Sequence, residues 1–516
     1  MNDSRTKNST RNIIFSLFAY LIQIILGFFV RRYFIFYFGE EYLGLSSVFT
    51  NVLSFLSLAE LGFGTAIVFS MYKPMAEGDD ETVRQLLQFY KKCYFIIAVI
   101  VIVLGLLIIP FMSYFEKQAP NVEVNFYLVY LIFLMNSVVS YFFAHRRSLL
   151  YTSQRNDLES KVNIILNIVL AGLQLVAICL AKNYYIYILL SGIISIINNL
   201  FIFIITQKKY SKFLQKPSGS LDKETRKTIN KNVYSMVFHK IGTIAVYSTD
   251  SLVIFLILGA MSLGKYSNYL LVTTYVSSII AIFTGALRGS IGNSIASESV
   301  EKNKELLKRL NFIYFFIVSF ATIAIYVLVD PFIDVVLTHS DTTSLVLDKT
   351  VLILICINFF LTQSRYMVGI FKECAGLYYQ DRFKSLIESG INLVVSIILA
   401  YYIGLAGVIM GTIISNIMTS LWIEPYILNK YYFKQSTLKY FGKYALYALA
   451  MLVSAIVTTF VCNFINVAGF WTLILKGIVC CMVAGTMLLI TMCPHKEFRD
   501  NLSWGKEIIK NLRRSK

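Results

Sequence analysis

Long runs of apolar residues, separated by short polar connections, follow one another along the whole chain. A helix needs about 20 mostly apolar residues, each rising 1.5 Å, to cross the hydrocarbon core of a bilayer. About fourteen segments meet this length, so the pattern predicts an all-α integral membrane protein. The predicted spans are 13–37, 43–72, 92–113, 125–144, 162–181, 185–206, 232–258, 265–290, 310–329, 350–370, 385–403, 407–428, 444–463 and 471–492.

The composition indicates the same class. Hydrophobic residues make up 57% of the 516 positions, charged residues make up 15%, and the mean hydropathy is +0.66. A soluble protein of this length does not need that much apolar surface. The spans and their short loops use nearly the whole chain, so little is left for a soluble domain.

Lysine and arginine gather on one predicted side of the membrane. Most of the 47 Lys and Arg residues fall in connections and tails that share one side of the membrane when successive spans cross it in opposite directions. Short loops rich in Lys and Arg stay in the cytoplasm, which predicts cytoplasmic termini. Topology and anionic lipid together account for the net charge of +18, so nucleic-acid binding is not expected.

The longest predicted inner connection, 207–231, is rich in lysine and separates six spans from the remaining eight. We interpret it as a basic cytoplasmic linker between an N-terminal six-helix lobe, 1–206, and a C-terminal six-helix lobe, 232–428. Helices 13 and 14 form an extra pair within 429–493. The basic cytoplasmic tail, 494–516, is either an interfacial helix or a frayed end.

A shift of 220 residues aligns the beginnings of the two lobes without a gap. It superposes Arg11-Asn12 on Lys231-Asn232, Gly39 on Gly259, Leu43-Gly44 on Leu263-Gly264, Ser70 on Ser290 and Ala76 on Ala296. Chance matches arise easily in apolar sequence, so unrelated halves are the alternative. Because the shift superposes the inner end, outer hairpin and next inner end of two helix pairs, it favours a parallel pseudo-repeat.

Charged side chains inside predicted spans are candidate functional residues, because each costs about 2.5 to 3.5 kcal/mol on insertion scales. Glu60 lies near the middle of the second span, among small residues that permit close approach. It faces a cavity or pairs with an arginine between helices. In the seventh span, His239 and Asp250 share a helix face suited to a wet pathway or proton site. Alternatively, Lys240 snorkels to the interface and Asp250 pairs locally.

Five further charges lie nearer the span ends. Arg31 and Arg32 occupy the outer third of the first span, where at most one of two adjacent residues can face a central cavity. They bind an anion or act as interfacial anchors. Arg288, Arg365 and Glu388 lie near inner span ends, each with the sign that the helix dipole favours. The arginines there would also attract a phosphate.

Missing motifs narrow the choice of function. The chain has no Gly-rich loop with Lys and Ser/Thr, so ATP hydrolysis is not predicted. The cysteines lack the spacing of a zinc or redox site, and no metal or other cofactor is predicted. One outer loop carries His339 and the acids Asp330, Asp334, Asp341 and Asp348. Such a loop leaves a membrane glycan polymerase or ligase as an alternative, although these enzymes usually carry more extramembrane mass.

Two stretches of the chain carry a resemblance to a known family. The first runs from Leu56 through Ala59-Glu60-Leu61-Gly62 to Ala66, followed by Ser70-Met71-Tyr72-Lys73-Pro74. The second comprises Tyr379-Gln380-Asp381-Arg382-Phe383-Lys384, Glu388, Asn392-Leu393, Ser396, Gly404, Gly407 and Gly411-Thr412. These stretches resemble the polysaccharide flippases of the Wzx type, within the multidrug, oligosaccharidyl-lipid and polysaccharide exporter superfamily. The span count and loop pattern extend the resemblance over essentially the whole chain.

The resemblance implies two six-helix lobes around a central cavity that open alternately to either side of a bacterial cytoplasmic membrane. It implies a cargo of oligosaccharide on undecaprenyl pyrophosphate, flipped outward for capsule, O-antigen or related glycan assembly. The expected partners are this cargo, membrane lipids, and a polysaccharide polymerase with its chain-length machinery. The family's basic cavity residues correspond to Arg31, Arg32, Arg288 and Arg365, and a proton or sodium gradient could drive the cycle. The alternative from the same superfamily is a cation-coupled multidrug exporter.

Overall fold

The computed structural model describes residues 5–57, 63–338, 344–377, 379–465, 467, 469–495, 497–501 and 503. For residues 5–13, 63, 65, 66, 228, 230–247 and 286 it describes the backbone alone. These described residues form helices and turns, and none of them belongs to a β-strand. The predicted all-α class is therefore confirmed.

The helices follow one another with short connections. The α-helices are α1 Arg5–Phe38, α2 Glu40–Leu56, α3 Phe63–Glu77, α4 Asp80–Leu106, α5 Met112–Lys117, α6 Phe126–Thr152, α7 Asn156–Val176, α8 Tyr184–Lys209, α9 Lys223–Ser297, α10 Val300–Phe332, α11 Lys349–Ser364, α12 Tyr366–Cys374, α13 Lys384–Ile403, α14 Leu405–Met418, α15 Ser420–Ile427, α16 Leu438–Asn463 and α17 Phe470–Met492. Short 3-10 or π segments extend or join them: η2 Ile109–Phe111, η3 Ala177–Ala181, η4 Ser211–Phe213, η5 Ile333–Leu337 and η6 Leu428–Phe433.

Within the described residues, 12 helices are long and apolar enough to cross a membrane. The predicted second span falls on α2 and α3, which flank the undescribed residues 58–62 and are each shorter than a full span. The predicted seventh span lies in the first part of α9, and its end joins the eighth within Ser248–Ser297. The protein is thus a multi-pass membrane protein, and the count of fourteen spans stays a prediction.

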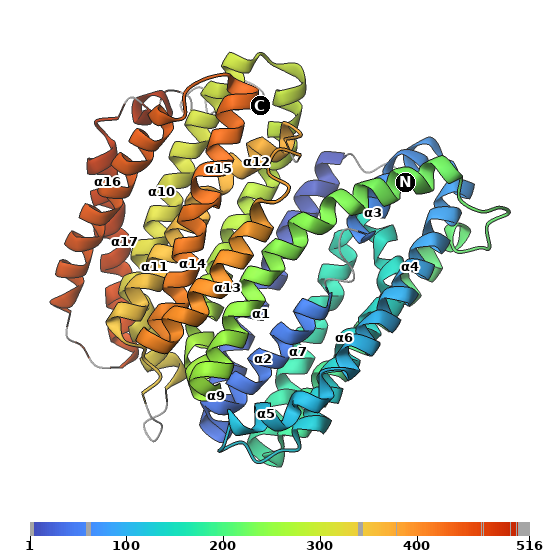
Figure 1. The fold of residues 1–516 in the computed structure, drawn as a ribbon, viewed down its shortest axis with the longest axis horizontal. Helices are drawn as coiled ribbons and strands as arrows, with labels where there is room; N and C mark the ends of the chain where they lie inside the picture. The colour runs from blue at the N-terminus through green and yellow to red at the C-terminus, as the bar shows by residue number, and fades with distance from the viewer. Residues whose placement is uncertain are drawn as a thin grey trace. The chain divides into compact units, whose positions relative to one another are not determined.

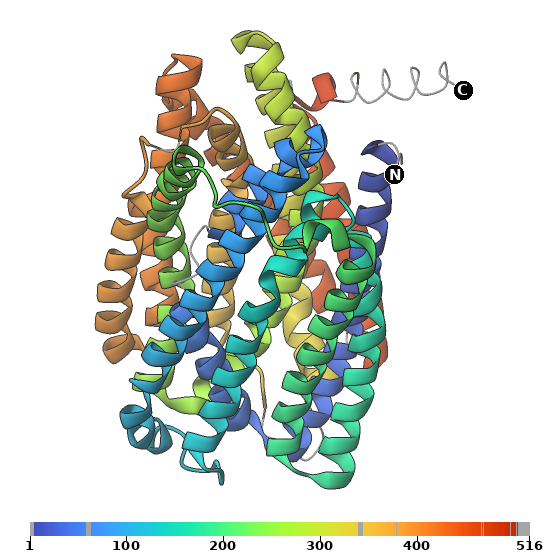
Figure 2. The same cartoon turned by 90° about the vertical axis from the view of Figure 1, so that its right-hand side faces the viewer.

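The chain divides into two compact units, Met1–Ser267 and Asn268–Lys516. In the first unit α6 packs against α4 and α8, while α7 packs against α1 (Figures 1 and 2). In the second unit α10 packs against α11, α16 and α17, and α13 lies along α14 (Figure 1). The boundary between the units falls inside α9, so the predicted lobes and linker stay predictions.

Two glycines 220 residues apart share one unusual backbone conformation. Gly39 precedes α2 with φ 85° and ψ 178°, and Gly259 breaks the path of α9 with φ 84° and ψ 170°. Glycine is favoured at such positive φ because it lacks a Cβ. The two positions match in the 220-residue alignment, and the structure gives both the same role at the start of a helix.

The helices that begin after these glycines touch each other reciprocally within the first unit. A Cβ at Gly44 would overlap the carbonyl oxygen of Ala260, and a Cβ at Gly264 would overlap that of Glu40. Each contact is the counterpart of the other in the 220-residue alignment, because Gly264 aligns with Gly44 and Ala260 aligns with Glu40. Small residues let two backbones approach this closely in a membrane.

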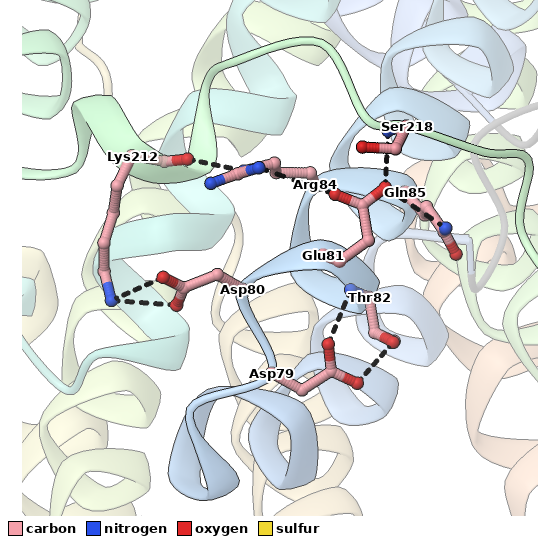
Figure 3. A network of polar contacts seen from close by, with 8 residues as sticks. All are labelled: Asp79, Asp80, Glu81, Thr82, Arg84, Gln85, Lys212 and Ser218. Carbon is pink, nitrogen blue, oxygen red and sulfur yellow. Dashed lines mark hydrogen bonds and ion pairs between the residues drawn. The ribbon is translucent and has the colours of Figure 1, made fainter.

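The segment between α8 and α9 lies against the N-terminus of α4 in the same unit. Figure 3 shows Lys212 Nζ at 2.8 and 3.1 Å from the two carboxylate oxygens of Asp80. The Ser218 amide donates to Glu81 over 2.6 Å, and Arg84 Nε donates to the Lys212 carbonyl over 2.7 Å. Acids at a helix N-terminus also match the helix dipole. The basic connection is therefore tied to α4 by charge.

Asp79 caps the same helix. Its carboxylate accepts from the Thr82 amide over 3.0 Å and from the Thr82 hydroxyl over 2.5 Å (Figure 3). These hydrogen bonds favour the ionised carboxylate and hold the pKa of Asp79 below its ordinary value. An ionised N-cap satisfies amides that the first helical turn cannot pair.

Candidate functional site

Arg31 is oriented by a hydrogen bond beside the close contact of α2 with α9 at Gly264. Its Nη2 donates a hydrogen bond of 2.5 Å to Ser267 Oγ, and that hydroxyl donates over 2.7 Å to the carbonyl of Gly264. Ser267 is buried, whereas Arg31 and the adjacent Arg32 are half-buried. The predicted arginine pair thus lies beside the contact between α2 and α9. A half-buried guanidinium is well suited to a phosphate, because it presents several fixed donors.

The structure describes the side chain of only one of the charged candidates predicted within the second and seventh spans. Asp250 is half-buried on α9 in the first unit. Glu60 lies outside the described residues, and the side chains of His239 and Lys240 lie outside them too. The proposed polar stripe along the seventh span therefore stays a prediction.

An apolar hollow of about 450 Å³ lies in the first unit between α2, α9 and the segment from α4 to α5. Its lining consists of Val52, Phe55, Leu56, Ile108, Phe111, Tyr114, Phe115, Leu252 and Leu256. Tyr114 carries the only hydroxyl among these lining side chains. A surface of this kind suits hydrocarbon, because it offers almost nothing to which water or a sugar could hydrogen-bond.

Arg365 is one of two cations that converge on a single buried carboxylate in the second unit. Its Nη1 donates to Glu424 Oε1 over 3.0 Å, and Lys384 donates to the same oxygen. Glu424 is 5% exposed and Lys384 is 6% exposed. Charges buried this deeply need partners, because desolvation of an unpaired ion costs several kcal/mol. The group joins the end of α11 and the start of α13 to α15.

A second buried ion pair lies beside this group. Lys372 at the end of α12 pairs with Asp381 in the following connection, and both side chains are almost fully buried. Arg288 on α9 pairs with Glu373, which follows Lys372 in the chain, but this pair is partly exposed. Both basic residues predicted near inner span ends, Arg288 and Arg365, are thus bound to glutamates. To bind an anionic cargo, they would have to exchange a carboxylate for a phosphate.

Glu388 belongs to a polar seam along the contact of α13 with α14 and α15. Ser420 Oγ donates to Glu388 over 2.6 Å, and one turn further Asn392 donates to Thr412 over 3.0 Å. Ser396 Oγ then donates to the carbonyl of Val408 over 3.1 Å. Residues 388, 392 and 396 share one helix face because of their four-residue spacing. Hydrogen bonds across helices are a common means of holding spans together in lipid.

This seam accounts for most of the second stretch that resembles the flippases. Asp381, Lys384, Glu388, Asn392 and Ser396 all contact neighbouring elements of the second unit. A Cβ at Gly407 would overlap the carbonyl of Leu399, and one at Gly411 would overlap Ser396. The stretch therefore keeps helices together rather than presenting a row of free charges.

A similar seam lies in the first unit. Glu159, Ser160 and Asn163 repeat the spacing of Glu388, Ser389 and Asn392. Asn198 donates to Asn163 over 2.9 Å. Arg147 lies 3.6 Å from Glu159 and also donates to Asn199 over 3.0 Å. The Glu-Ser-x-x-Asn spacing is the sequence signal that could have identified both seams.

Sequence reasoning did not single out Glu424 or Lys372. Glu424 lies inside the predicted span 407–428, where the rule applied to Glu60 would have marked it.

Two acids of the predicted outer loop also have structural roles. Asp330 accepts from Tyr269 over 2.6 Å and from Lys349 over 2.7 Å, and Asp348 caps α11. Among the described residues, no group of three or more His, Cys, Asp or Glu could hold a metal ion.

A family model supplies the identification. The model described as "Polysaccharide biosynthesis protein" matches residues 9–287, more than half of the chain. The chain belongs to this family. The resemblance seen in the sequence is thereby confirmed. No curated protein matched the sequence significantly.

Solved structures of this fold are membrane transporters. The "Lipid II flippase MurJ, inward closed conformation" has a TM-score of 0.65 and 18% identity, covering 93% of this chain and 99% of that chain. An inward-facing multidrug resistance MATE family transporter of the MOP superfamily has a TM-score of 0.65 and 15% identity, covering 80% and 98%. A MOP superfamily transporter from Pyrococcus furiosus has a TM-score of 0.56 and 14% identity, covering 83% and 97%. The chain has the fold of MOP-superfamily transporters.

Proposed function

We propose that this polysaccharide biosynthesis protein is a flippase for lipid-linked oligosaccharide. Its cargo is an oligosaccharide on undecaprenyl pyrophosphate, moved from the inner to the outer leaflet by alternating access. It works in the bacterial cytoplasmic membrane with both termini in the cytoplasm. The exported unit then enters capsule, O-antigen or related glycan assembly, with a polysaccharide polymerase and its chain-length machinery as downstream partners.

The family match over residues 9–287 is the observation on which this proposal rests. The likeness to a lipid II flippase over 93% of the chain supports it, because that protein is named for moving a lipid-linked molecule. The physical problem is the same for any such cargo. A pyrophosphate and sugars cannot cross about 30 Å of hydrocarbon without groups that replace their hydration.

The roles of the site residues follow from their chemistry. Arg31 and Arg32 bind phosphate oxygens, and Arg288 and Arg365 do so after release from Glu373 and Glu424. The apolar hollow of the first unit receives the first part of the lipid chain. Glu60, His239, Lys240, Asp250 and Glu388 are the candidates for coupling the cycle to a proton or sodium gradient.

The proposal is tested with the full chain reconstituted in vesicles that carry fluorescent undecaprenyl-pyrophosphate oligosaccharide. Loss of fluorescence to a membrane-impermeant quencher reports the cargo that has changed leaflet. Arg31→Gln should slow the initial rate at low cargo about tenfold or more, because a hydrogen bond to a charged group contributes about 1.5–3 kcal/mol. Lys117→Gln, at an exposed cation of the same unit, should leave the rate unchanged.

Two outcomes would contradict different parts of the proposal. Wild-type protein that moves no lipid-linked oligosaccharide would overturn the function. An unchanged rate for Arg31→Gln, at equal protein in the vesicles, would overturn only the role of that arginine.

The second candidate function is cation-coupled multidrug export, supported by the likeness to MATE transporters. Two observations favour the flippase. The lipid II flippase match covers 93% of the chain, whereas the MATE match covers 80%. The predicted deep cations include Arg31, Arg288 and Arg365, which bind Ser267, Glu373 and Glu424, and cationic side chains of this kind repel a cationic drug. Uptake of a fluorescent cationic dye by the same vesicles, without flipping of the glycolipid, would favour the exporter.

A further inference from the structure

A lysine-lined pocket of about 370 Å³ lies in the second unit, between α10, α12, η6 and α16. Pockets that hold small molecules usually measure about 300 to 1,000 Å³, so this volume is sufficient for a headgroup. Its basic side chains are Lys304 and Lys308 from α10 and Lys439 and Lys443 from α16. We call this site the lysine pocket.

The lysine pocket has an excess of positive charge. Four lysines line it, and Glu497 is its only acidic lining residue. Glu497 pairs with Lys443. In the described part of the chain, Lys304, Lys308 and Lys439 form no ion pair. Like charges gathered around one hollow repel each other, and an anion bound among them would relieve that repulsion.

Two polar atoms at this pocket are buried without a hydrogen-bond partner among the described residues. They are the hydroxyl of Tyr440 and Oδ1 of Asn311, and both residues line the pocket. The neighbouring hydroxyl of Tyr444 is already bonded to Ser364 over 2.8 Å. A buried polar atom with no partner costs free energy, so these two atoms point to a ligand. Tyr440 can donate to a phosphate oxygen, and Asn311 Oδ1 can accept from a headgroup hydroxyl.

The rest of the lining is apolar or aromatic. Leu307, Val368 and Leu428 face the same hollow as Tyr444 and Tyr447. Tyrosine is favoured where lipid chains meet headgroups, since its ring is apolar and its hydroxyl is polar. The lysines come from the helix ends predicted to lie on the cytoplasmic side. The ligand thus needs an anionic head and an apolar body.

We propose that the lysine pocket binds the headgroup phosphate of an anionic phospholipid from the cytoplasmic leaflet. The phosphate lies among Lys304, Lys308 and Lys439 and accepts from Tyr440, while a hydroxyl of the headgroup donates to Asn311. The first carbons of the acyl chains contact the apolar lining. Basic pockets between spans on the cytoplasmic side are a recurrent form of headgroup site. This lipid is a resident one, distinct from the transported cargo.

The test measures phospholipid retained by the full chain, purified in neutral detergent, using native mass spectrometry. Phosphatidylglycerol should bind and phosphatidylcholine should bind far more weakly. Each lysine near an anionic headgroup accounts for about a fivefold change in affinity, so K304Q/K308Q/K439Q should weaken binding about a hundredfold. The matched control is K216Q/K223Q/K227Q, which changes three exposed lysines of the first unit and should bind as wild type does.

Tyr440→Phe separates a ligand role from a structural one. Removal of an unpartnered hydroxyl should raise the unfolding temperature of the lipid-free protein, because a buried polar group is lost. The same change should weaken phosphatidylglycerol binding several-fold. A role in folding alone predicts a lower unfolding temperature and unchanged lipid binding.

Three results would overturn the proposal. Equal binding of phosphatidylglycerol by the triple variant and the wild type would exclude the lysine pocket as the site. Equal binding of phosphatidylcholine would remove the requirement for an anion. If inorganic phosphate raised the unfolding temperature fully and phosphatidylglycerol added nothing to that rise, the pocket would be assigned to free phosphate. None of these measurements uses the cargo, so they do not depend on the flippase assay.

Discussion

At the scale of single residues, several of the most deeply buried charges of the second unit lie in ion pairs. Lys372 and Asp381 are 1% and 3% exposed, and they bind each other. Glu424 accepts from both Arg365 and Lys384. An ion in an apolar surrounding is costly unless a partner offsets its lost hydration. These pairs therefore make the positions of the surrounding elements strongly interdependent.

Lys372→Met should destabilise the protein severely, because it leaves the Asp381 carboxylate buried without its cation. Breaking one side of a buried pair costs about 3–5 kcal/mol. The double variant Lys372→Met with Asp381→Leu should recover most of that loss, since it buries no uncompensated charge. Denaturant unfolding in detergent measures both.

Lys302→Met is the matched control for that experiment. Lys302 pairs with Glu298 over 2.8 Å, but both side chains are largely exposed, so the stability should hardly change. If Lys372→Met were no more harmful than this control, the buried pair would contribute nothing to stability.

At the scale of elements, close helix contacts depend on positions without a side chain. α2 and α9 meet where Gly44 lies against Ala260 and Gly264 lies against Glu40. α13 and α14 meet through Gly407, Gly411 and the polar seam beside them. In lipid there is no hydrophobic force between helices, so close packing and hydrogen bonds hold them together.

Gly264→Ala should destabilise the protein by about 1–3 kcal/mol, because its methyl group would overlap the Glu40 carbonyl oxygen. The control is Gly285→Ala in the same helix, where a Cβ meets nothing within 4 Å. That change should be neutral or stabilising, since alanine favours a helix more than glycine does. Thermal unfolding of the two variants in one detergent compares them, and equal stability would contradict the contact.

At the scale of the whole molecule, the fold matches those of a lipid II flippase and of a MATE family transporter of the MOP superfamily. Under the proposed function, net movement of the cargo to one leaflet needs an energy source. The membrane potential provides about 2.3 kcal/mol per charge per 100 mV. We propose that a proton or sodium gradient drives the cycle.

In vesicles with imposed proton and sodium gradients, collapse of these gradients should slow the net transport of cargo to one leaflet, whereas its exchange between the leaflets at equilibrium should continue. Ionophores selective for each ion identify which gradient matters. Asp250→Asn should reduce the response to that gradient if Asp250 carries the coupling ion. Undiminished net transport without any gradient would rule out this form of coupling.

The sequence by itself determined the class of the protein, because that class depends on local properties. Apolar segments of about 20 residues specify membrane helices wherever they lie. The match of Gly39 with Gly259 in the 220-residue alignment is likewise visible in the sequence, whereas their shared positive φ is seen only in the structure. The flippase resemblance came from similarly local stretches, and the family match confirmed it.

Only the tertiary structure decided which charges meet. Arg365 and Glu424 are 59 positions apart, and Lys384 and Glu424 are 40 apart, so no spacing rule pairs them. The partners depend on how α11, α13 and α15 pack, and a helix period cannot supply that information. The lysine pocket likewise needs α10 beside α16, two helices more than one hundred residues apart. Hydropathy fixes that a segment lies in the membrane, whereas packing fixes its neighbours.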